Sequence, residues 1–126
     1  MMEVFGLAHL MECLDPQIYG AYLDAGHLRA EGEDFRVALG MAKPWLRLLA
    51  VKDVLLEQNQ ENGHGKIVNK WVPAGQGSVN WTYVFDCLKQ IGWQHPISIH
   101  CEFKCEPEEF LDKAGEEIAF FRKLCK

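Results

Sequence analysis

Three short apolar segments, each ending in charged residues and each followed by a helical pattern, most constrain how this chain can fold. They lie near residues 18–24, 46–52 and 97–103. Strands that each lead into a helix pair in parallel through right-handed crossovers, so their C-terminal ends meet at one edge of the sheet. The sequence therefore predicts a single α/β domain over residues 1–126, built from three parallel βα units preceded by one helix.

Helical spacing of apolar residues indicates where the helices lie. A first helix is expected over residues 2–14, with one face made of Met2, Phe5, Ala8, Met11 and Leu14. A second begins after Asp34, a third is capped by Asn80, and the last opens at Pro107. The last helix is expected to bury one stripe, made of Phe110, Leu111, Ala114, Ile118, Phe121 and Leu124.

Residues 54–79 form a long stretch rich in Gly, Asn and Gln. A structureless segment of this length is unusual inside a compact domain, so we expect an active-site lid or a binding loop. A short extra strand is expected over residues 66–72. Gly75-x-Gly77 supplies backbone freedom before the next helix, but on its own it is weak evidence for a phosphate site.

The first strand ends in Asp24, followed closely by Gly26 and His27. Chemistry in α/β proteins concentrates at the C-terminal ends of strands. We expect Gly26 to let the chain leave the strand, so that His27 points into the same space as Asp24. The same residues are also compatible with Asp24 capping the next turn beside a surface histidine.

The third strand has two contrasting faces. One face is apolar, and the other carries Ser98, His100 and Glu102. A polar face of this kind is typical of a barrel interior near its C-terminal rim, although a solvated edge strand gives the same pattern. Lys52 is expected on the Glu102 side, where it would bind substrate or simply neutralise Asp24 and Glu102.

Composition narrows the possible partners. The 126 residues carry a net charge of −5 and no basic run, which argues against nucleic acid or an anionic membrane. No apolar run reaches the ~20 residues needed to span a bilayer. Five cysteines with a single close pair, and no signal peptide, favour free thiols in the cytoplasm. Small molecules and proteins remain as partners.

Four segments together resemble the sugar phosphate isomerase/epimerase family of xylose isomerase-like TIM barrels. They are Tyr22–His27, Ala50–Asp53, Gly75–Trp81 and Ser98–Glu102, in the family's order and spacing. The resemblance implies that the three strands correspond to the last three of a barrel's eight. It also implies a divalent metal that polarises a sugar carbonyl, with carboxylates that move a proton between neighbouring carbons.

The resemblance also assigns roles to individual residues. Asp24 matches a metal ligand, and Glu102 matches a glutamate that is both ligand and acid/base. His27 matches a substrate-contacting or auxiliary ligand position. Ala50 stands where many members have a metal-binding histidine, and His100 could substitute as a ligand or be a hydrogen-bonded interior histidine. The implied cofactor is Mn²⁺, Mg²⁺, Co²⁺ or Zn²⁺.

The family's second catalytic glutamate belongs to a strand that this chain lacks. We therefore expect an incomplete isomerase or epimerase that needs a homodimer partner or a complementary half-barrel chain. The substrate class is a sugar or sugar phosphate. The alternative is a non-catalytic, self-associating binding or assembly module derived from the same family, and the chain could also be a fragment of a longer enzyme.

Overall fold

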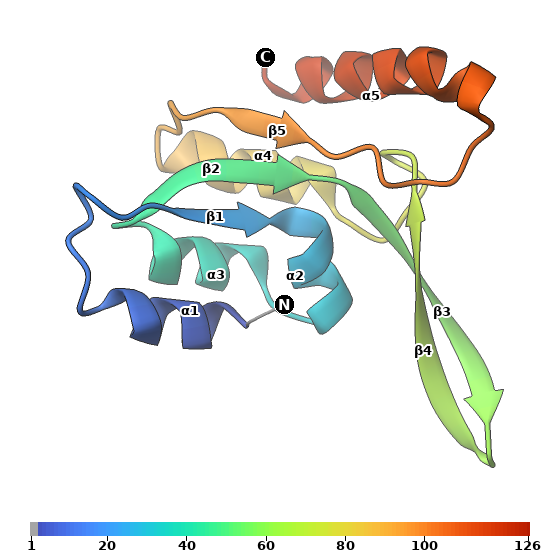
Figure 1. Ribbon diagram of the computed structural model, residues 1–126, viewed down its shortest axis with the longest axis horizontal. Helices are drawn as coiled ribbons and strands as arrows, with labels where there is room; N and C mark the ends of the chain where they lie inside the picture. The colour runs from blue at the N-terminus through green and yellow to red at the C-terminus, as the bar shows by residue number, and fades with distance from the viewer. Residues whose placement is uncertain (1–2) are drawn as a thin grey trace.

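The computed structural model describes residues 3–126 and has a three-stranded parallel sheet at its centre (Figure 1). The strands are β1 (Ala21–Asp24), β2 (Leu46–Val51) and β5 (Ile97–Ile99), in the order β1-β2-β5. Register pairs Asp24 with Ala50 and Ala50 with Ser98, so these residues lie in one row across the sheet. The first strand leads into α2 (Ala25–Glu31) and the third into α5 (Phe110–Leu124), while β2 reaches α4 (Trp81–Gln90) through a β-hairpin; this arrangement forms part of a TIM barrel.

The third strand ends at Ile99, four residues before the expected end at 103. The His100 N–H still donates to the Val51 carbonyl at 3.0 Å, and the chain then leaves the sheet. Glu102 therefore lies on an irregular segment beyond the strand, while Phe103 turns inward and is buried.

Helices cover one face of the sheet. They are α1 (Val4–Met11), α2 (Ala25–Glu31), α3 (Phe35–Ala42), α4 (Trp81–Gln90) and α5 (Phe110–Leu124), with a 3₁₀ turn η1 (Pro107–Glu109) before α5. Asp34 and Asn80 cap α3 and α4 as expected, each accepting a backbone N–H at 3.0 Å. The core consists of Leu23, Leu49 and Val51 packed against apolar side chains of α3 and α4. The opposite sheet face is open, and Tyr22 on it is 54% exposed.

Two predicted helix faces are only partly right. In α1, Met11 of the expected face is buried, as is Val4, whereas Phe5 is 71% exposed; Met2 lies outside the described residues. In α5, Phe121 of the expected stripe is buried, but Leu111 is 80% exposed and Glu117, outside the stripe, is buried. Periodicity locates an apolar stripe, but the neighbour actually packed against a helix decides which side is buried.

A long β-hairpin occupies most of the stretch expected to be a lid. Strands β3 (Asp53–Glu61) and β4 (His64–Val72) pair antiparallel and project away from the sheet (Figure 1). The turn residues Asn62 and Gly63 have φ values of 52° and 81°. This Asn-Gly pair is a strong hairpin signal, and it would have located both strands. The expected extra strand over 66–72 makes up most of β4.

Two further structural facts bear on the sequence expectations. All five cysteines are free. Within residues 3–126, no helix is both long and apolar enough to cross a membrane.

Candidate functional site

Asp24, the last residue of β1, is the most deeply buried acid of the candidate site. Only 3% of the residue is exposed. Its Oδ1 accepts the His27 N–H at 3.0 Å and caps α2, so the turn-capping role and a site role coexist in one side chain. The other oxygen, Oδ2, is directed at Lys52. Gly26 therefore lies inside α2 rather than in a loop that leaves the strand.

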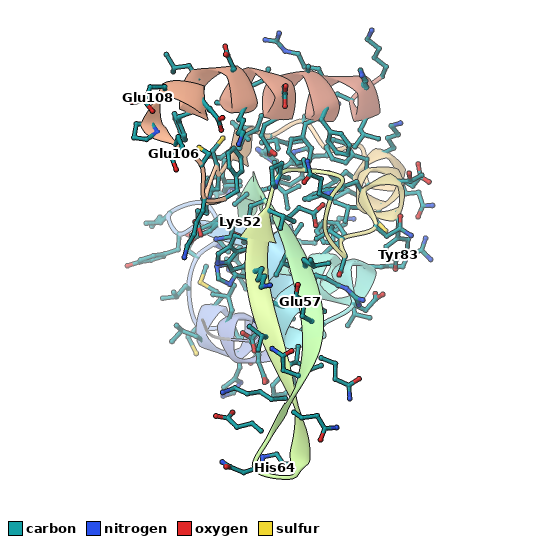
Figure 2. All side chains as sticks on the ribbon, turned by 90° about the vertical axis from the view of Figure 1, so that its right-hand side faces the viewer. Lys52, Glu57, His64, Tyr83, Glu106 and Glu108 are labelled. Carbon is teal, nitrogen blue, oxygen red and sulfur yellow. The ribbon has the colours of Figure 1, made fainter. Side chains whose placement is uncertain are left out.

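Lys52 is a buried lysine that joins the two acids of the site. Its residue is 4% exposed, and Nζ lies 3.3 Å from Asp24 Oδ2 and 2.8 Å from Glu102 Oε1. The ammonium also sits 4.4 Å from the ring centroid of Trp71. A buried ammonium needs opposite charges around it, and a facing aromatic ring adds a cation–π attraction. Lys52 lies at the base of the hairpin, far from His64 at its tip (Figure 2).

Glu102 closes the site from the segment after β5. Its side chain is 46% exposed, which leaves the carboxylate open to solvent and to a ligand. The hydrogen bond from Lys52 is the main reason that the pKa of Glu102 lies below its ordinary value. Glu102 is therefore ionised at neutral pH and able to accept a proton.

The two histidines flank this cluster. His100 Nδ1 lies 4.0 Å from Asp24 Oδ2 and 3.9 Å from Glu102 Oε1, which is too long for hydrogen bonds. His27 stands edge-on to Trp71, with ring centroids 4.8 Å apart. Burial lowers the pKa of His27, although the nearby Asp24 carboxylate opposes that shift, so a neutral imidazole is favoured at neutral pH.

These residues, as arranged, do not fit a divalent metal. A hard cation needs carboxylate oxygens converging on it at roughly 2–2.6 Å, and the space between the two acids is taken by the Lys52 ammonium. Ala50, which is fully buried, offers no ligand atom. Within residues 3–126, no group of three or more His, Cys, Asp or Glu side chains is arranged to hold a metal ion.

Sequence reasoning missed the second buried aspartate, Asp53, which faces away from this site. Five N–H groups donate to its carboxylate at 2.8–3.2 Å: those of Val54, Gly75, Gly77 and Val79, and the indole of Trp81. Asp53 thereby ties the loop after β4 and the start of α4 to the sheet. Its position next to Lys52 and upstream of Gly75-x-Gly77 was the sequence feature that could have indicated a role for Asp53.

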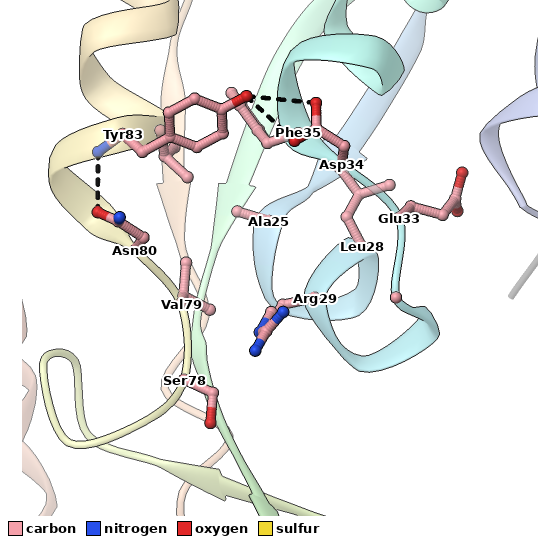
Figure 3. A pocket seen from close by; sticks show the side chains of 12 residues that line it. Ala25, Leu28, Arg29, Glu33, Asp34, Phe35, Ser78, Val79, Asn80 and Tyr83 are labelled. Atoms are coloured by element: carbon pink, nitrogen blue, oxygen red, sulfur yellow. Dashed lines mark hydrogen bonds between the residues drawn. The ribbon is translucent and has the colours of Figure 1, made fainter.

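A separate cavity of about 410 Å³ lies between α2 and the start of α4 (Figure 3). Tyr83 spans it by donating its hydroxyl hydrogen to the Asp34 carboxylate, at 3.1 Å from Oδ2. Arg29 and Ser78 line its other end. None of the residues expected to form the site lies in it.

The parallel sheet and the acidic site at the C-terminal ends of its strands define part of an α/β barrel. The chain belongs to the xylose isomerase-like TIM barrel family, whose model matches residues 6–124. Among curated protein sequences, none matches the chain significantly.

Solved structures agree with this assignment. A xylose isomerase domain protein from Planctomyces limnophilus is 20% identical with a TM-score of 0.72, and 98% of this chain covers 43% of that one. The D-allulose 3-epimerase from Methylomonas sp. is 20% identical with a TM-score of 0.65, and the match covers 98% of this chain and 43% of that one. The zinc-bound IOLI protein is 23% identical with a TM-score of 0.53, and the match covers 83% of this chain and 35% of that one. The chain thus spans less than half the length of each of these structures.

Proposed function

We propose that this chain supplies part of the active site of a sugar or sugar phosphate isomerase or epimerase. The supporting observation is that Asp24, Lys52 and Glu102 meet at the C-terminal rim of parallel strands, with Lys52 Nζ within 3.3 Å of both carboxylates. Rims of this kind hold the active sites of TIM-barrel enzymes. Membership of the family, and the likeness to the D-allulose 3-epimerase, support sugar carbonyl chemistry.

The proposed roles follow from charge and exposure. Glu102, ionised and half-exposed, is the base that takes a proton from the carbon beside the substrate carbonyl. Lys52 donates N–H groups to the carbonyl or hydroxyl oxygens and stabilises the negative charge that develops there. His27 is a further substrate contact, held against Trp71. Asp24 fixes the direction of Lys52.

Whether this site binds a divalent metal is a separate question from which reaction it supports. The expected ligand set was Asp24, Glu102 and His100, holding Mn²⁺, Mg²⁺, Co²⁺ or Zn²⁺, and a zinc-bound structure is among those similar to this chain. Binding there would require Lys52 to move away from both carboxylates. His100 is near enough to join such a set only after that movement.

A partner is part of the proposal. Moving a proton from one face of a carbon to the other takes an acid/base group on each face, and the family resemblance assigns the second glutamate to a strand that this chain lacks. The exposed Tyr22 on the open sheet face supports closure by a second copy or by a complementary half-barrel. The five free thiols support a reducing, cytoplasmic location.

Solvent deuterium exchange tests the proposed function. Ketoses and their phosphates are incubated with the protein in D₂O, and NMR follows loss of the proton beside the carbonyl. We expect exchange that falls about 100-fold or more in Glu102→Gln, within the usual range for removing an acid/base group. The matched control Glu108→Gln removes an exposed carboxylate in the 3₁₀ turn η1 before α5 and should leave the rate unchanged (Figure 2).

The alternative is a non-catalytic, self-associating module of the same family. The open sheet face favours it, because a surface of this kind needs cover whether or not chemistry takes place. A dimer by light scattering without any deuterium exchange would favour this alternative. A monodisperse monomer at micromolar concentration would contradict self-association in both versions.

A further inference from the structure

The position of Lys52 carries a second inference about the same site. Its ammonium lies where a cation shared by Asp24 and Glu102 would lie, 3.3 and 2.8 Å from their oxygens. Asp24 is nearly fully buried, so its negative charge cannot be compensated by water alone. One fixed positive charge is therefore already bound between the two acids.

The surrounding structure is built around the Lys52 side chain. A Cβ on Gly26 would lie 2.4 Å from the Lys52 carbonyl oxygen and 2.9 Å from its Cγ, so only glycine lets α2 pass this close. The Trp71 ring, 4.4 Å from Nζ, covers another side of the ammonium. Backbone, aromatic ring and two carboxylates thus hold this lysine in one place, with 5% of its side chain exposed.

Charge balance argues against a lysine and a divalent cation together. Asp24 and Glu102 supply two negative charges, whereas Lys52 and a divalent ion would bring three positive charges into a largely buried space. His100 adds no negative charge, and Ala50 adds no ligand. With Lys52 alone, the three side chains keep one net negative charge, which suits a base that must accept a proton.

We propose that Lys52 is the resident cation of this site and takes the place of a divalent metal, so that the site binds a hydroxy-carbonyl sugar without metal. The assignment of the ligand class depends on the proposed function. The inference that the site holds no metal does not depend on the proposed function, and it is tested separately. Lys52 lies between the two carboxylates and pairs with both, and its ammonium is the positive charge available to a substrate oxygen.

Manganese titration tests the wild-type site first. After dialysis against EDTA, Mn²⁺ is added and the free ion is followed by electron paramagnetic resonance, in the wild type and in Asp24→Asn. We expect no saturable site tighter than about 1 mM, the weak end of the ordinary affinity scale. A single tighter site per chain that Asp24→Asn abolishes would overturn the proposal.

Lys52→Met supplies the second arm, because it removes the charge and keeps most of the side-chain length. We expect Mn²⁺ to bind this variant at least about tenfold more tightly than the wild type, and the gain to vanish when Asp24→Asn is added. Lys113→Met is the matched control, since Lys113 pairs with Glu109 at 2.8 Å on the surface of α5. Equal Mn²⁺ affinity in Lys52→Met and the wild type would overturn the proposal.

An alternative variant and a deuterium-exchange measurement keep the two titrations decisive. If Lys52→Met does not fold, the wild-type titration still decides, and Gly26→Ala repeats the second arm by pushing Lys52 from its place. Deuterium exchange in EDTA-treated protein separates the two proposals. Exchange that persists supports both, exchange restored only by Mn²⁺ overturns the metal-free site, and no exchange with no Mn²⁺ site overturns the proposed function alone.

Discussion

Asp24, at the end of β1 in the parallel sheet, and Asp53, at the start of the hairpin strand β3, are two buried aspartates that are stabilised in different ways. Asp53 is 1% exposed and accepts five N–H groups, with no cation among the partners that the structure gives it. Asp24 is 3% exposed, accepts one N–H and faces the Lys52 ammonium. Lys52 and Asp53 are neighbours in the chain, yet each belongs to a different one of these centres.

The difference separates a structural carboxylate from one that is able to react. Asp53 has both oxygens fully engaged by groups fixed in the backbone, so it holds segments together and has nothing left to offer a ligand. Around Asp24, the compensating charge is on a side chain, and that side chain also reaches the half-exposed Glu102. A ligand can reach the second arrangement through the half-exposed Glu102, but it cannot reach the first.

The largest effect is expected for Asp53→Ala. Five N–H donors lose their acceptor, and each buried donor left unpaired costs about 1–3 kcal/mol unless water replaces it. We expect a loss of roughly 3–5 kcal/mol in the free energy of unfolding, measured by urea denaturation. Asp86→Ala, on the exposed side of α4, is the control and should change it by less than about 0.5 kcal/mol. A small effect at Asp53 would make the two aspartates equivalent.

Gly77→Ala tests the same centre without removing any charge. A Cβ there would lie 2.1 Å from Asp53 Oδ1, so the loop must move away and weaken its bonds to that carboxylate. Overpacking of this kind costs about 1–3 kcal/mol. Gly40→Ala in α3 meets nothing within 4 Å, and should instead stabilise the protein by roughly 0.5–1 kcal/mol. Equal melting shifts in the two variants would contradict the close packing around Asp53.

Sequence patterns predicted the features that depend on order along the chain. Parallel strands ending in Asp24 and Lys52, and the caps Asp34 and Asn80, follow from local periodicity and capping chemistry. They also predicted that Asp24, Lys52 and Glu102 would face one space.

Features that depend on neighbours distant in the chain were not predicted. Glu117, on a position expected to face solvent, is buried because its Oε1 accepts the Ala74 N–H of the loop that Asp53 anchors. Phe5 and Leu111 are exposed because the apolar stripe of a helix does not itself specify a partner. The many donors to Asp53 converge from residues 54–81, and only the folded chain brings them together.

Glu117 sharpens the comparison through pH. It accepts the Ala74 N–H of the loop that Asp53 anchors, and burial raises its pKa above the ordinary value. For an acid with a raised folded pKa, the native state binds the extra proton, so stability falls as pH rises from about 4.5 through the folded pKa. Relative to the wild type, Glu117→Gln should therefore gain stability over this rise, by about 1.4 kcal/mol per unit of pKa shift. Urea titrations from pH 4 to 8 measure the difference, and a constant gap would contradict it.

Glu102→Gln is expected to have the smallest effect on stability and the opposite dependence on pH. Lys52 lowers the pKa of Glu102, so its contribution is fully present above about pH 4.5 and is lost as pH falls through the lower folded pKa. Because the side chain is 46% exposed, solvent screening limits that contribution to less than about 1 kcal/mol. The gap between wild type and variant should thus be small at pH 7 and close below pH 4.5, whereas Glu108→Gln shows no such closure. A gap that widened on acidification would mean that Lys52 does not hold Glu102 as a carboxylate, and the contrast between the Asp24 and Asp53 centres would then fail.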